Sequence, residues 1–198
     1  MEMSEWAYHL GQLMPTNNAQ IPIASHVINF GTGVFESLRC YKNKNEIYIK
    51  GLEQHIKRFQ NSLITINLKP ISEHTIQEAL FSYVTKNNMD DAYIRIIGYP
   101  NGLCTMLHTI NFSSEFSIFG WHTPNTRDYN PIKLNIAQLR RPNPSATLSR
   151  AKVCGLYVID SIVQNNAALA GFDSGLLLNE DGTICEAAGA NIFIVKDN

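Results

Sequence analysis

Two residues in the second half of the chain, Lys152 and Glu186, have the side chains that a covalently held cofactor requires. Lys152 lies in SRAKVCGLYVIDSIVQ, at the start of a helical pattern, and Glu186 lies at the end of a β-hairpin that the turn residues Asp181-Gly182 predict. A lysine amine can bind an aldehyde as an imine, and a carboxylate can keep a pyridine nitrogen protonated. The pair therefore matches the two protein groups that pyridoxal 5'-phosphate most needs, although singly a surface lysine and a hairpin glutamate would look the same.

Further residues could supply the other groups that this cofactor uses. Phosphate is commonly bound by arginine side chains, helix N-termini or loop amides, and Arg58 in QHIKRF is of a suitable type, although it could equally be an exposed helix arginine. Tyr157 could donate a hydrogen bond to the phenolic oxygen of the ring, and its alternative is a core tyrosine. The small residues that follow Glu186 leave room for a ligand beside the backbone.

The composition excludes several classes of protein. The chain has 198 residues, of which 44% are hydrophobic and 17% charged, and its formal net charge is −1. This balance is typical of a globular protein and argues against a nucleic-acid surface, which needs a basic excess. No apolar run reaches the roughly 20 residues that span a bilayer, and the first residues do not resemble a secretion signal. We therefore expect a cytoplasmic protein with no nucleic-acid or membrane partner, reduced cysteines and no metal site.

Hydrophobic periodicity predicts a mixed α/β fold in two domains. We expect a small N-terminal α/β domain at residues 1–121, an interdomain linker rich in Pro, Asn and Thr at 122–131, and the start of a larger C-terminal domain at 132–198. The predicted helices cover 51–68, 72–88 and 153–171, and the predicted strands cover 46–50, 91–100, 114–122, 132–141, 174–180, 183–188 and 191–195.

The last predicted strand would leave an apolar sheet edge uncovered, which proteins seldom tolerate. We therefore expect that the C-terminal domain is incomplete in this chain, or that a partner covers the edge.

Four segments together resemble the class IV, or fold-type IV, pyridoxal-phosphate-dependent aminotransferases. This family includes the branched-chain and D-amino-acid aminotransferases and aminodeoxychorismate lyase. FGTGVFESLRCY (30–41) is similar to the family's aromatic-glycine block followed by VFEG(I/L)R, and EQHIKRFQNSL (53–63) is similar to its HxxRL segment. AKVCGLY (151–157) resembles the segment of the Schiff-base lysine, and GFDSGLLLNEDGTICEAAGANIFIV (171–195) resembles a long pattern that ends in E-x-x-x-x-N-(I/L)-F.

The resemblance implies a two-domain α/β (α+β) enzyme that forms homodimers and binds pyridoxal 5'-phosphate between its domains. It implies that Lys152 is the catalytic imine lysine and proton shuttle, and that Glu186 pairs with the pyridine nitrogen. It also implies that Arg58 binds the phosphate and that Tyr157 contacts the ring oxygen. The remaining cofactor-side residues would be Asn191, Ala187, Ala188, Gly189 and Ala190.

Three residues bear on the substrate that the resemblance implies. Arg95, in DAYIR, matches an arginine that helps to receive the second carboxylate of glutamate, and Phe35 matches a wall of the side-chain pocket. Phe30 stands where branched-chain enzymes usually have tyrosine, and a phenyl ring cannot donate a hydrogen bond. The resemblance favours transfer of an amino group from a branched-chain L-amino acid to a 2-oxo acid such as 2-oxoglutarate. Aminodeoxychorismate lyase, D-amino-acid aminotransferase and an inactive cofactor-binding or dimer-forming homologue remain alternatives.

Overall fold

A computed structural model describes residues 2–44, 46–103, 106–123, 130–143, 145, 148 and 150–196. Contacts between residues divide the chain into two compact units, one formed by Met1–Thr126 with Arg150–Gly155 and the other by Arg127–Ser149 with Leu156–Asn198. The segment of Lys152 thus belongs to the first unit, whereas the sequence pattern assigned it to the C-terminal domain. Most of the predicted linker, at 124–129, lies outside the described residues. No helix within the described ranges is long and apolar enough to cross a membrane.

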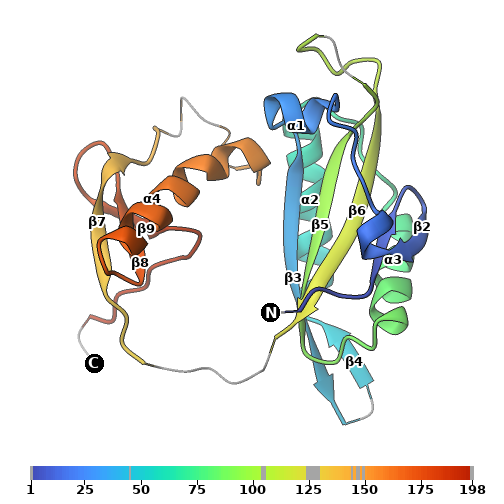
Figure 1. Cartoon of the computed structure of the whole chain (residues 1–198), viewed down its shortest axis with the longest axis horizontal. Helices are drawn as coiled ribbons and strands as arrows, with labels where there is room; N and C mark the ends of the chain where they lie inside the picture. Colours follow the sequence, from blue (N-terminus) through green and yellow to red (C-terminus); the bar gives the residue numbers. More distant parts are fainter. Residues whose placement is uncertain are drawn as a thin grey trace. The chain divides into compact units, whose positions relative to one another are not determined.

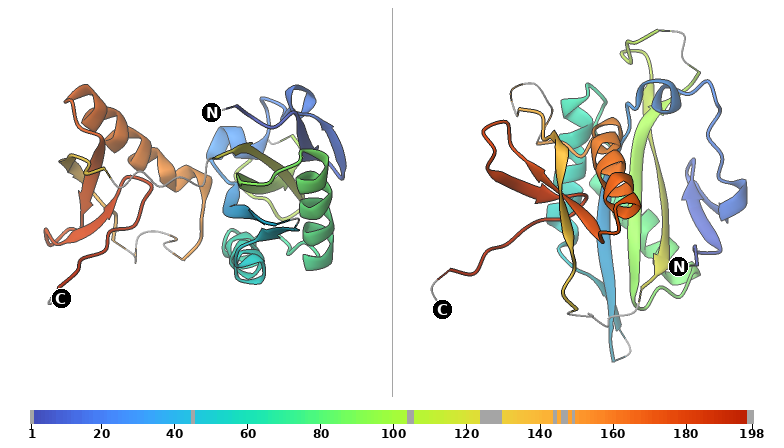
Figure 2. Two further views of the ribbon diagram at one scale, coloured as in Figure 1. Left: turned by 90° about the horizontal axis from the view of Figure 1, so that it is seen from below. Right: turned by 60° about the vertical axis from the view of Figure 1, so that its left-hand side comes forward.

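A six-stranded antiparallel sheet forms the first unit (Figure 1). Its strand order is β2-β1-β6-β5-β3-β4. Two long helices, α2 (Leu52–Thr65) and α3 (Glu73–Lys86), cover one face of the sheet, as the views of Figure 2 also show. The strands are β1 (Trp6–His9), β2 (Gln12–Pro15), β3 (Val34–Asn43), β4 (Glu46–Ile49), β5 (Ala92–Asn101) and β6 (Ser113–His122), and a short 3-10 helix, η1 (Thr16–Asn18), and α1 (His26–Phe30) lie between β2 and β3.

Alternation along the central strands gives the sheet two different faces, because successive side chains of a strand point to opposite sides. On the helix-covered face Ile94, Ile96 and Ile118 are fully buried. Gly98 lies on the same face, where a Cβ atom would come within 2.7 Å of the Phe59 ring of α2, so only glycine fits there. The opposite face carries Phe35, Ser37, Arg39, Tyr93 and Arg95, and we call it the arginine face.

Local signals set the ends of the two long helices. Gly51 precedes α2 with a left-handed φ of 64°, which glycine adopts without strain. The Ser72 hydroxyl accepts a hydrogen bond from the Thr75 amide (3.4 Å), so Ser72 is the N-cap residue of α3.

The second unit contains a three-stranded sheet and one helix. β7 (Leu134–Arg140) is parallel to β8 (Ser174–Leu178), which is antiparallel to β9 (Ile184–Ala187). Helix α4 (Val158–Leu169) connects β7 to β8 and packs on both, and it follows a short 3-10 helix, η2 (Cys154–Tyr157). Gly175 allows this packing, because a Cβ there would lie 2.3 Å from Val163 of α4.

Two sequence predictions have different outcomes in the second unit. The hairpin around Asp181-Gly182 is confirmed by the β8–β9 pairing. The predicted strand at 191–195 is wrong, since these residues form no strand and Phe193, Ile194 and Val195 are exposed. The physical reason is pairing: β9 bonds to β8, and no further strand of the described chain bonds to 191–195. The described cysteines, Cys40, Cys154 and Cys185, are free thiols.

Candidate active site

The backbone of Lys152 is bonded on both sides within the first unit. Its amide donates a hydrogen bond to the Ser62 hydroxyl of α2 (3.1 Å), and its carbonyl accepts one from the Phe35 amide of β3 (2.9 Å). Next along the chain, the Cys154 amide donates to the Gly33 carbonyl (2.8 Å). Lys152 is half-buried, and its Nζ lies 4.9 Å from the centre of the Phe35 ring. The amine therefore projects from a fixed backbone onto an aromatic surface.

Two glycines bring the FGTG block against the segment of Lys152. The Gly155 amide donates to the Gly31 carbonyl (3.2 Å), and a Cβ on Gly31 would lie 3.0 Å from the Gly155 Cα. Gly31 also has a left-handed φ of 65°, so both its backbone conformation and its close contact require glycine. Phe30, the residue before it, is 44% exposed and packs on the His26 ring, with 4.9 Å between the two ring centres.

Arg58 is fixed by a buried carboxylate. Its Nε and Nη2 donate to the two Glu36 oxygens at 2.7 and 2.6 Å, and His55 Nδ1 lies 3.1 Å from the same carboxylate. Burial raises the pKa of Glu36, but hydrogen bonds from Arg58, His55 and the Ser37 amide outweigh it and lower the pKa to about 2. The Arg58 side chain remains 49% exposed. The structure thus gives Arg58 a set orientation, and its predicted role towards phosphate stays a prediction.

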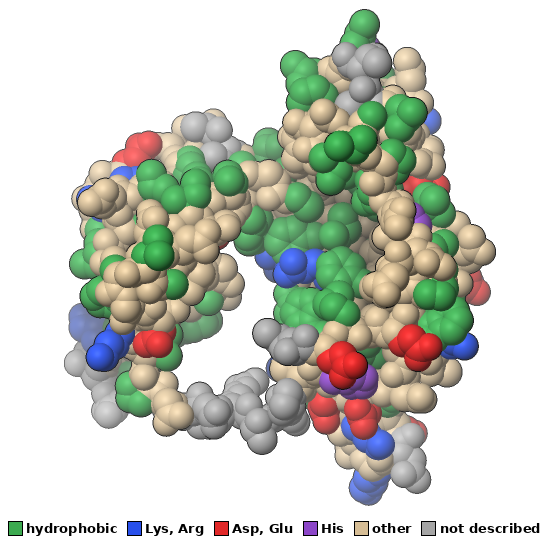
Figure 3. All heavy atoms as spheres, in the orientation of Figure 1, with side chains coloured by type: hydrophobic (Ala, Val, Ile, Leu, Met, Phe, Trp, Pro, Cys, Tyr) green, Lys and Arg blue, Asp and Glu red, His purple; other side chains and the backbone are tan. Residues whose placement is uncertain are grey.

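The arginine face brings three predicted residues together. The Arg95 guanidinium lies 4.7 Å from the centre of the Phe35 ring, the same ring that the Lys152 amine approaches. Arg95 Nη2 also donates to the Tyr93 hydroxyl (3.2 Å). In Figure 3, Lys and Arg side chains lie among hydrophobic side chains on the visible face of this unit. The Lys152 amine and the Arg95 guanidinium therefore both lie beside the Phe35 ring.

Cys154 lies close to this cluster, and its thiol is less acidic than an ordinary cysteine thiol. Burial raises the pKa of its thiol, and the nearby Arg95 charge only partly offsets this effect. A thiol with a raised pKa stays protonated near neutral pH, and the thiolate is the nucleophilic form.

In the second unit, Glu186 belongs to a charged network. Arg141 Nε lies 3.0 Å from Glu186 Oε1, and Arg141 Nη1 donates to Asp160 Oδ2 (3.2 Å). The other oxygen of Asp160, a nearly buried residue, accepts a hydrogen bond from the Gly189 amide (3.0 Å). Arg141 thereby orients the predicted carboxylate, and Asp160 fixes the turn that follows it.

The predicted cofactor-side residues form a tight turn after Glu186. The amides and carbonyls of Ala187 and Ala190 bond reciprocally at 3.0 Å, and Gly189 has a left-handed φ of 70°. Ala188 is tied to β8 through the Gly175 carbonyl (2.9 Å). Asn191 follows the turn and is exposed.

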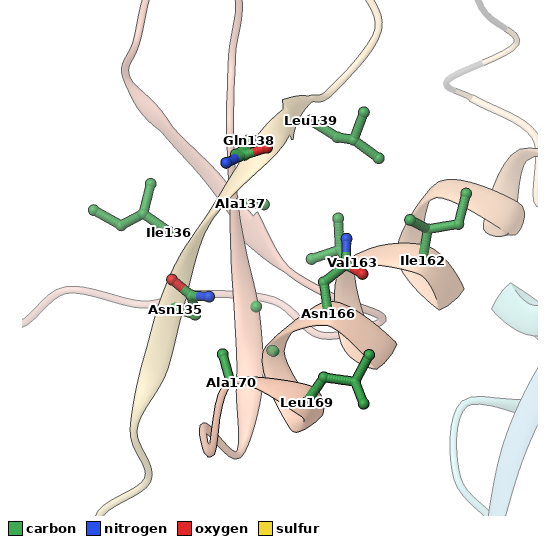
Figure 4. A pocket seen from close by; sticks show the side chains of 12 residues that line it. Asn135, Ile136, Ala137, Gln138, Leu139, Ile162, Val163, Asn166, Leu169 and Ala170 are labelled. Carbon is green, nitrogen blue, oxygen red and sulfur yellow. The ribbon is translucent and has the colours of Figure 1, made fainter.

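The other described parts of the second unit add a half-buried tyrosine and a cavity. Tyr157 is the N-cap residue of α4. A cavity of about 630 Å³ lies between β7 and α4, with Leu139, Ile162 and Leu169 among its lining residues, and Figure 4 shows Ile136 pointing away from α4. No predicted site residue lines this cavity. Within the described residues, no group of three His, Cys, Asp or Glu side chains could hold a metal ion.

Sequence reasoning missed Ser62, Arg141 and Asp160. Ser62 carries no local signal, because its importance depends on a contact across 90 positions of the chain. The arginine at the end of a strand and the lone acid in an apolar helix could have drawn attention to Arg141 and Asp160.

Comparisons with known proteins point to one family. The sequence model of the family described as Amino-transferase class IV matches residues 33–198. The chain is 28% identical over 198 residues to a protein of Aquifex aeolicus named probable branched-chain-amino-acid aminotransferase, and 28% identical over 192 residues to the branched-chain-amino-acid aminotransferase of Pseudomonas aeruginosa. These matches cover 98% and 94% of this chain but only 64% and 62% of the relatives.

A solved structure gives the same result at the level of the fold. The T.th. branched-chain amino acid aminotransferase, solved in complex with N-(5'-phosphopyridoxyl)-L-glutamate, superposes with a TM-score of 0.86 at 26% identity. The match covers 93% of this chain and 62% of that structure, and it confirms the predicted mixed α/β fold of the fold-type IV enzymes. Because the family match extends over most of the sequence, the chain belongs to the class IV aminotransferase family.

Proposed function

We propose that the protein is a pyridoxal 5'-phosphate-dependent aminotransferase that moves an amino group from a branched-chain L-amino acid to a dicarboxylic 2-oxo acid such as 2-oxoglutarate. One observation carries this proposal: the Lys152 amine and the Arg95 guanidinium both pack on the Phe35 ring, at 4.9 and 4.7 Å from its centre. An amine for proton transfer, an apolar wall and a cation for a second carboxylate are the groups that such a reaction needs. The names of the matched relatives support the choice of substrate class.

The residues present fit the cofactor. A Cβ at Gly189 would meet no atom within 4 Å, so the turn after Glu186 borders open space. The ion pair with Arg141 engages Oε1 of Glu186 and holds the carboxylate in one orientation. When bound, pyridoxal 5'-phosphate supplies an electrophilic aldehyde and a ring that accepts electrons. Lys152 would hold the aldehyde, Glu186 the pyridine nitrogen and Arg58 the phosphate, with Tyr157, Asn191 and residues 187–190 around the ring.

The chain's own residues then divide the work of the reaction. The Lys152 amine takes the α-proton of the substrate and later returns a proton. Because its backbone is bonded to Ser62 and Phe35, the amine returns to the same place in each half-reaction. The Phe35 ring contacts the apolar side chain of the donor, and Arg95 binds the second carboxylate of the acceptor. The negative charge of Glu186 favours the protonated pyridine nitrogen.

We further propose that the protein is cytoplasmic and, on the basis of the family resemblance, that it forms a homodimer. Sedimentation equilibrium of the purified protein tests the oligomeric state, and fractionation of the source cells tests the location.

A spectral titration tests the proposed activity. Protein loaded with the cofactor is mixed separately with leucine, glutamate and D-alanine, and the visible absorption of the lysine-bound cofactor is followed. Bleaching by leucine and glutamate, with release of the 2-oxo acid, supports the proposal. Bleaching by D-alanine alone would identify a D-amino-acid aminotransferase, and pyruvate release from an amino-chorismate would identify the lyase. An absorption band that no substrate changes would identify an inactive homologue. The Lys152→Ala variant is the control, and it is expected to lack turnover and to remain folded.

A further inference from the structure

Ser37 lies directly opposite Arg95 on the arginine face. The two residues are partners in the antiparallel pairing of β3 with β5, and Phe35 precedes Ser37 by two positions on the same face. Directly opposed side chains in an antiparallel pair have Cβ atoms about 4.5–5.5 Å apart. Ser37 also stands at the position of glycine in the VFEG(I/L)R pattern, so this chain adds a side chain opposite Arg95.

Each member of this pair has a buried donor without a partner in the described structure. The Ser37 hydroxyl and the Arg95 Nε are both shielded from water, and neither makes a hydrogen bond. The Ser37 amide, in contrast, donates to Glu36 Oε1 at 2.8 Å. Buried polar groups are nearly always hydrogen-bonded, and leaving one unpaired is costly. Two such donors on neighbouring residues indicate a place for one shared acceptor.

Arg95 lacks an anion among the described residues. The ion pairs there join other residues, and none includes Arg95. Aromatic rings and one hydrogen bond to the Tyr93 hydroxyl hold the guanidinium instead. These contacts leave the guanidinium charge without an anionic partner there, and the Ser37 hydroxyl, which also has no hydrogen-bond partner, lies at the opposed position on β3.

We propose that Ser37 is a specificity-determining residue of this site. Its hydroxyl acts with Arg95 to bind the distal carboxylate of a dicarboxylic substrate, and its side chain narrows the space for a branched apolar substrate. Ser37 thus supplies, on β3, a hydroxyl of the kind that Phe30 does not provide. The inference rests on the proposed function, because it assigns the acceptor class to the same cluster of Lys152, Phe35 and Arg95.

Binding of two probes tests the inference without turnover. Glutarate has a distal carboxylate, and 4-methylvaleric acid has a branched apolar end. Their affinities for the purified protein are measured by isothermal titration calorimetry, for the unsubstituted chain and for Ser37→Ala. A hydrogen bond to a charged group predicts that Ser37→Ala weakens glutarate binding about 10-fold or more and changes 4-methylvaleric acid binding less than about twofold.

Two further variants separate the hydroxyl from packing. Ser37→Cys keeps the size of the side chain but has only a weak donor, so it should also lose affinity for glutarate. Ser114→Ala is the matched control. The Ser114 hydroxyl is also buried without a hydrogen-bond partner, but the residue opposite Ser114 on the neighbouring strand is Pro100, not Arg95. Ser114→Ala should leave both affinities unchanged.

Equal effects of Ser37→Ala on the two probes, or no loss of glutarate binding in either Ser37 variant, would overturn the inference. So would an unsubstituted protein that does not bind glutarate. The spectral titration decides the proposed function separately. Transamination with a glutarate affinity that is independent of Ser37 would refute only the role of Ser37, and Ser37-dependent glutarate binding without any half-reaction would refute only the aminotransferase activity.

Discussion

Removing Arg58 should destabilise the first unit more than removing its partner, Glu36. Glu36 is completely buried, whereas the Arg58 side chain is half exposed. Arg58→Met therefore leaves a buried carboxylate with only His55 and the Ser37 amide beside it, and removing one partner of a buried pair costs about 3–5 kcal/mol. Glu36→Gln leaves a cation that water can still solvate, so we expect a loss of about 1–2 kcal/mol. Glu36→Gln alters no residue of the proposed site directly.

The same pair predicts the pH dependence of stability. The pKa of Glu36 falls from an ordinary value of 4.5 to about 2 in the folded chain. This pKa difference corresponds to a contribution of at most about 3 kcal/mol to the free energy of unfolding. The actual contribution is smaller, because water screens the exposed part of Arg58. Since the folded pKa is the lower one, the stabilisation is complete above about pH 5 and is lost as the pH falls towards 2. In Arg58→Met, burial dominates and raises the Glu36 pKa, so that variant should regain stability as the pH falls.

Urea unfolding followed by tryptophan fluorescence measures both effects. The two tryptophans, Trp6 and Trp121, lie in the first unit, so their signal reports this unit alone. The free energy of unfolding is compared at pH 7 and pH 3, and the value for Glu36→Gln is subtracted at each pH to remove the contribution of other carboxylates. Equal losses in the two variants at pH 7, or a difference between unsubstituted protein and Glu36→Gln that does not shrink at pH 3, would refute the reasoning.

Three further predictions follow from single contacts. Gly98→Ala forces a methyl group against the Phe59 ring and should destabilise the first unit by about 1–3 kcal/mol, measured by the same urea unfolding; an unchanged midpoint would contradict the close packing. Ser72→Ala removes the cap of α3 and should cost about 1 kcal/mol, with Ser72→Asp as a control that keeps the cap. Arg141→Met should weaken cofactor binding by about 10-fold, measured by equilibrium dialysis, because Glu186 loses the side chain that orients it; unchanged affinity would show that this orientation is unimportant.

Elements with strong local signals were predictable from the sequence. Alternation predicted β5 and β6 close to their observed ends, and Asp181-Gly182 predicted the β8–β9 hairpin. The β1–β2 hairpin was not predicted, because its strands have only four residues each. Its turn also contains Leu10 with a positive φ of 48°, a conformation that a leucine in the sequence does not indicate. The prediction of a strand at 191–195 was wrong although its apolar signal was strong. Apolar residues form a strand only where a neighbouring strand is available for pairing.

The candidate site was predictable in its residue types but not in its supporting contacts. Lys152, its aromatic neighbour Phe35 and Arg95 were all predicted as site residues from the sequence, and the structure brings these three together. The bond from the Lys152 amide to Ser62 could not be predicted, because it depends on how α2 packs beside β3. Alternation of side chains within β3 does explain the unexpected pair of Ser37 with Arg95, once the register with β5 is known.

The path of the chain between the two units limits how this protein can be divided. The first unit is discontinuous, because it takes Arg150–Gly155 as well as Met1–Thr126. A gene fragment that stopped after residue 126 would encode the six-stranded sheet without Lys152. A fragment that began at residue 127 would encode the amine without the strand and helix that anchor its backbone. Neither half could be exchanged with another protein as a working module, so recombination or engineering of this scaffold has to carry both units together.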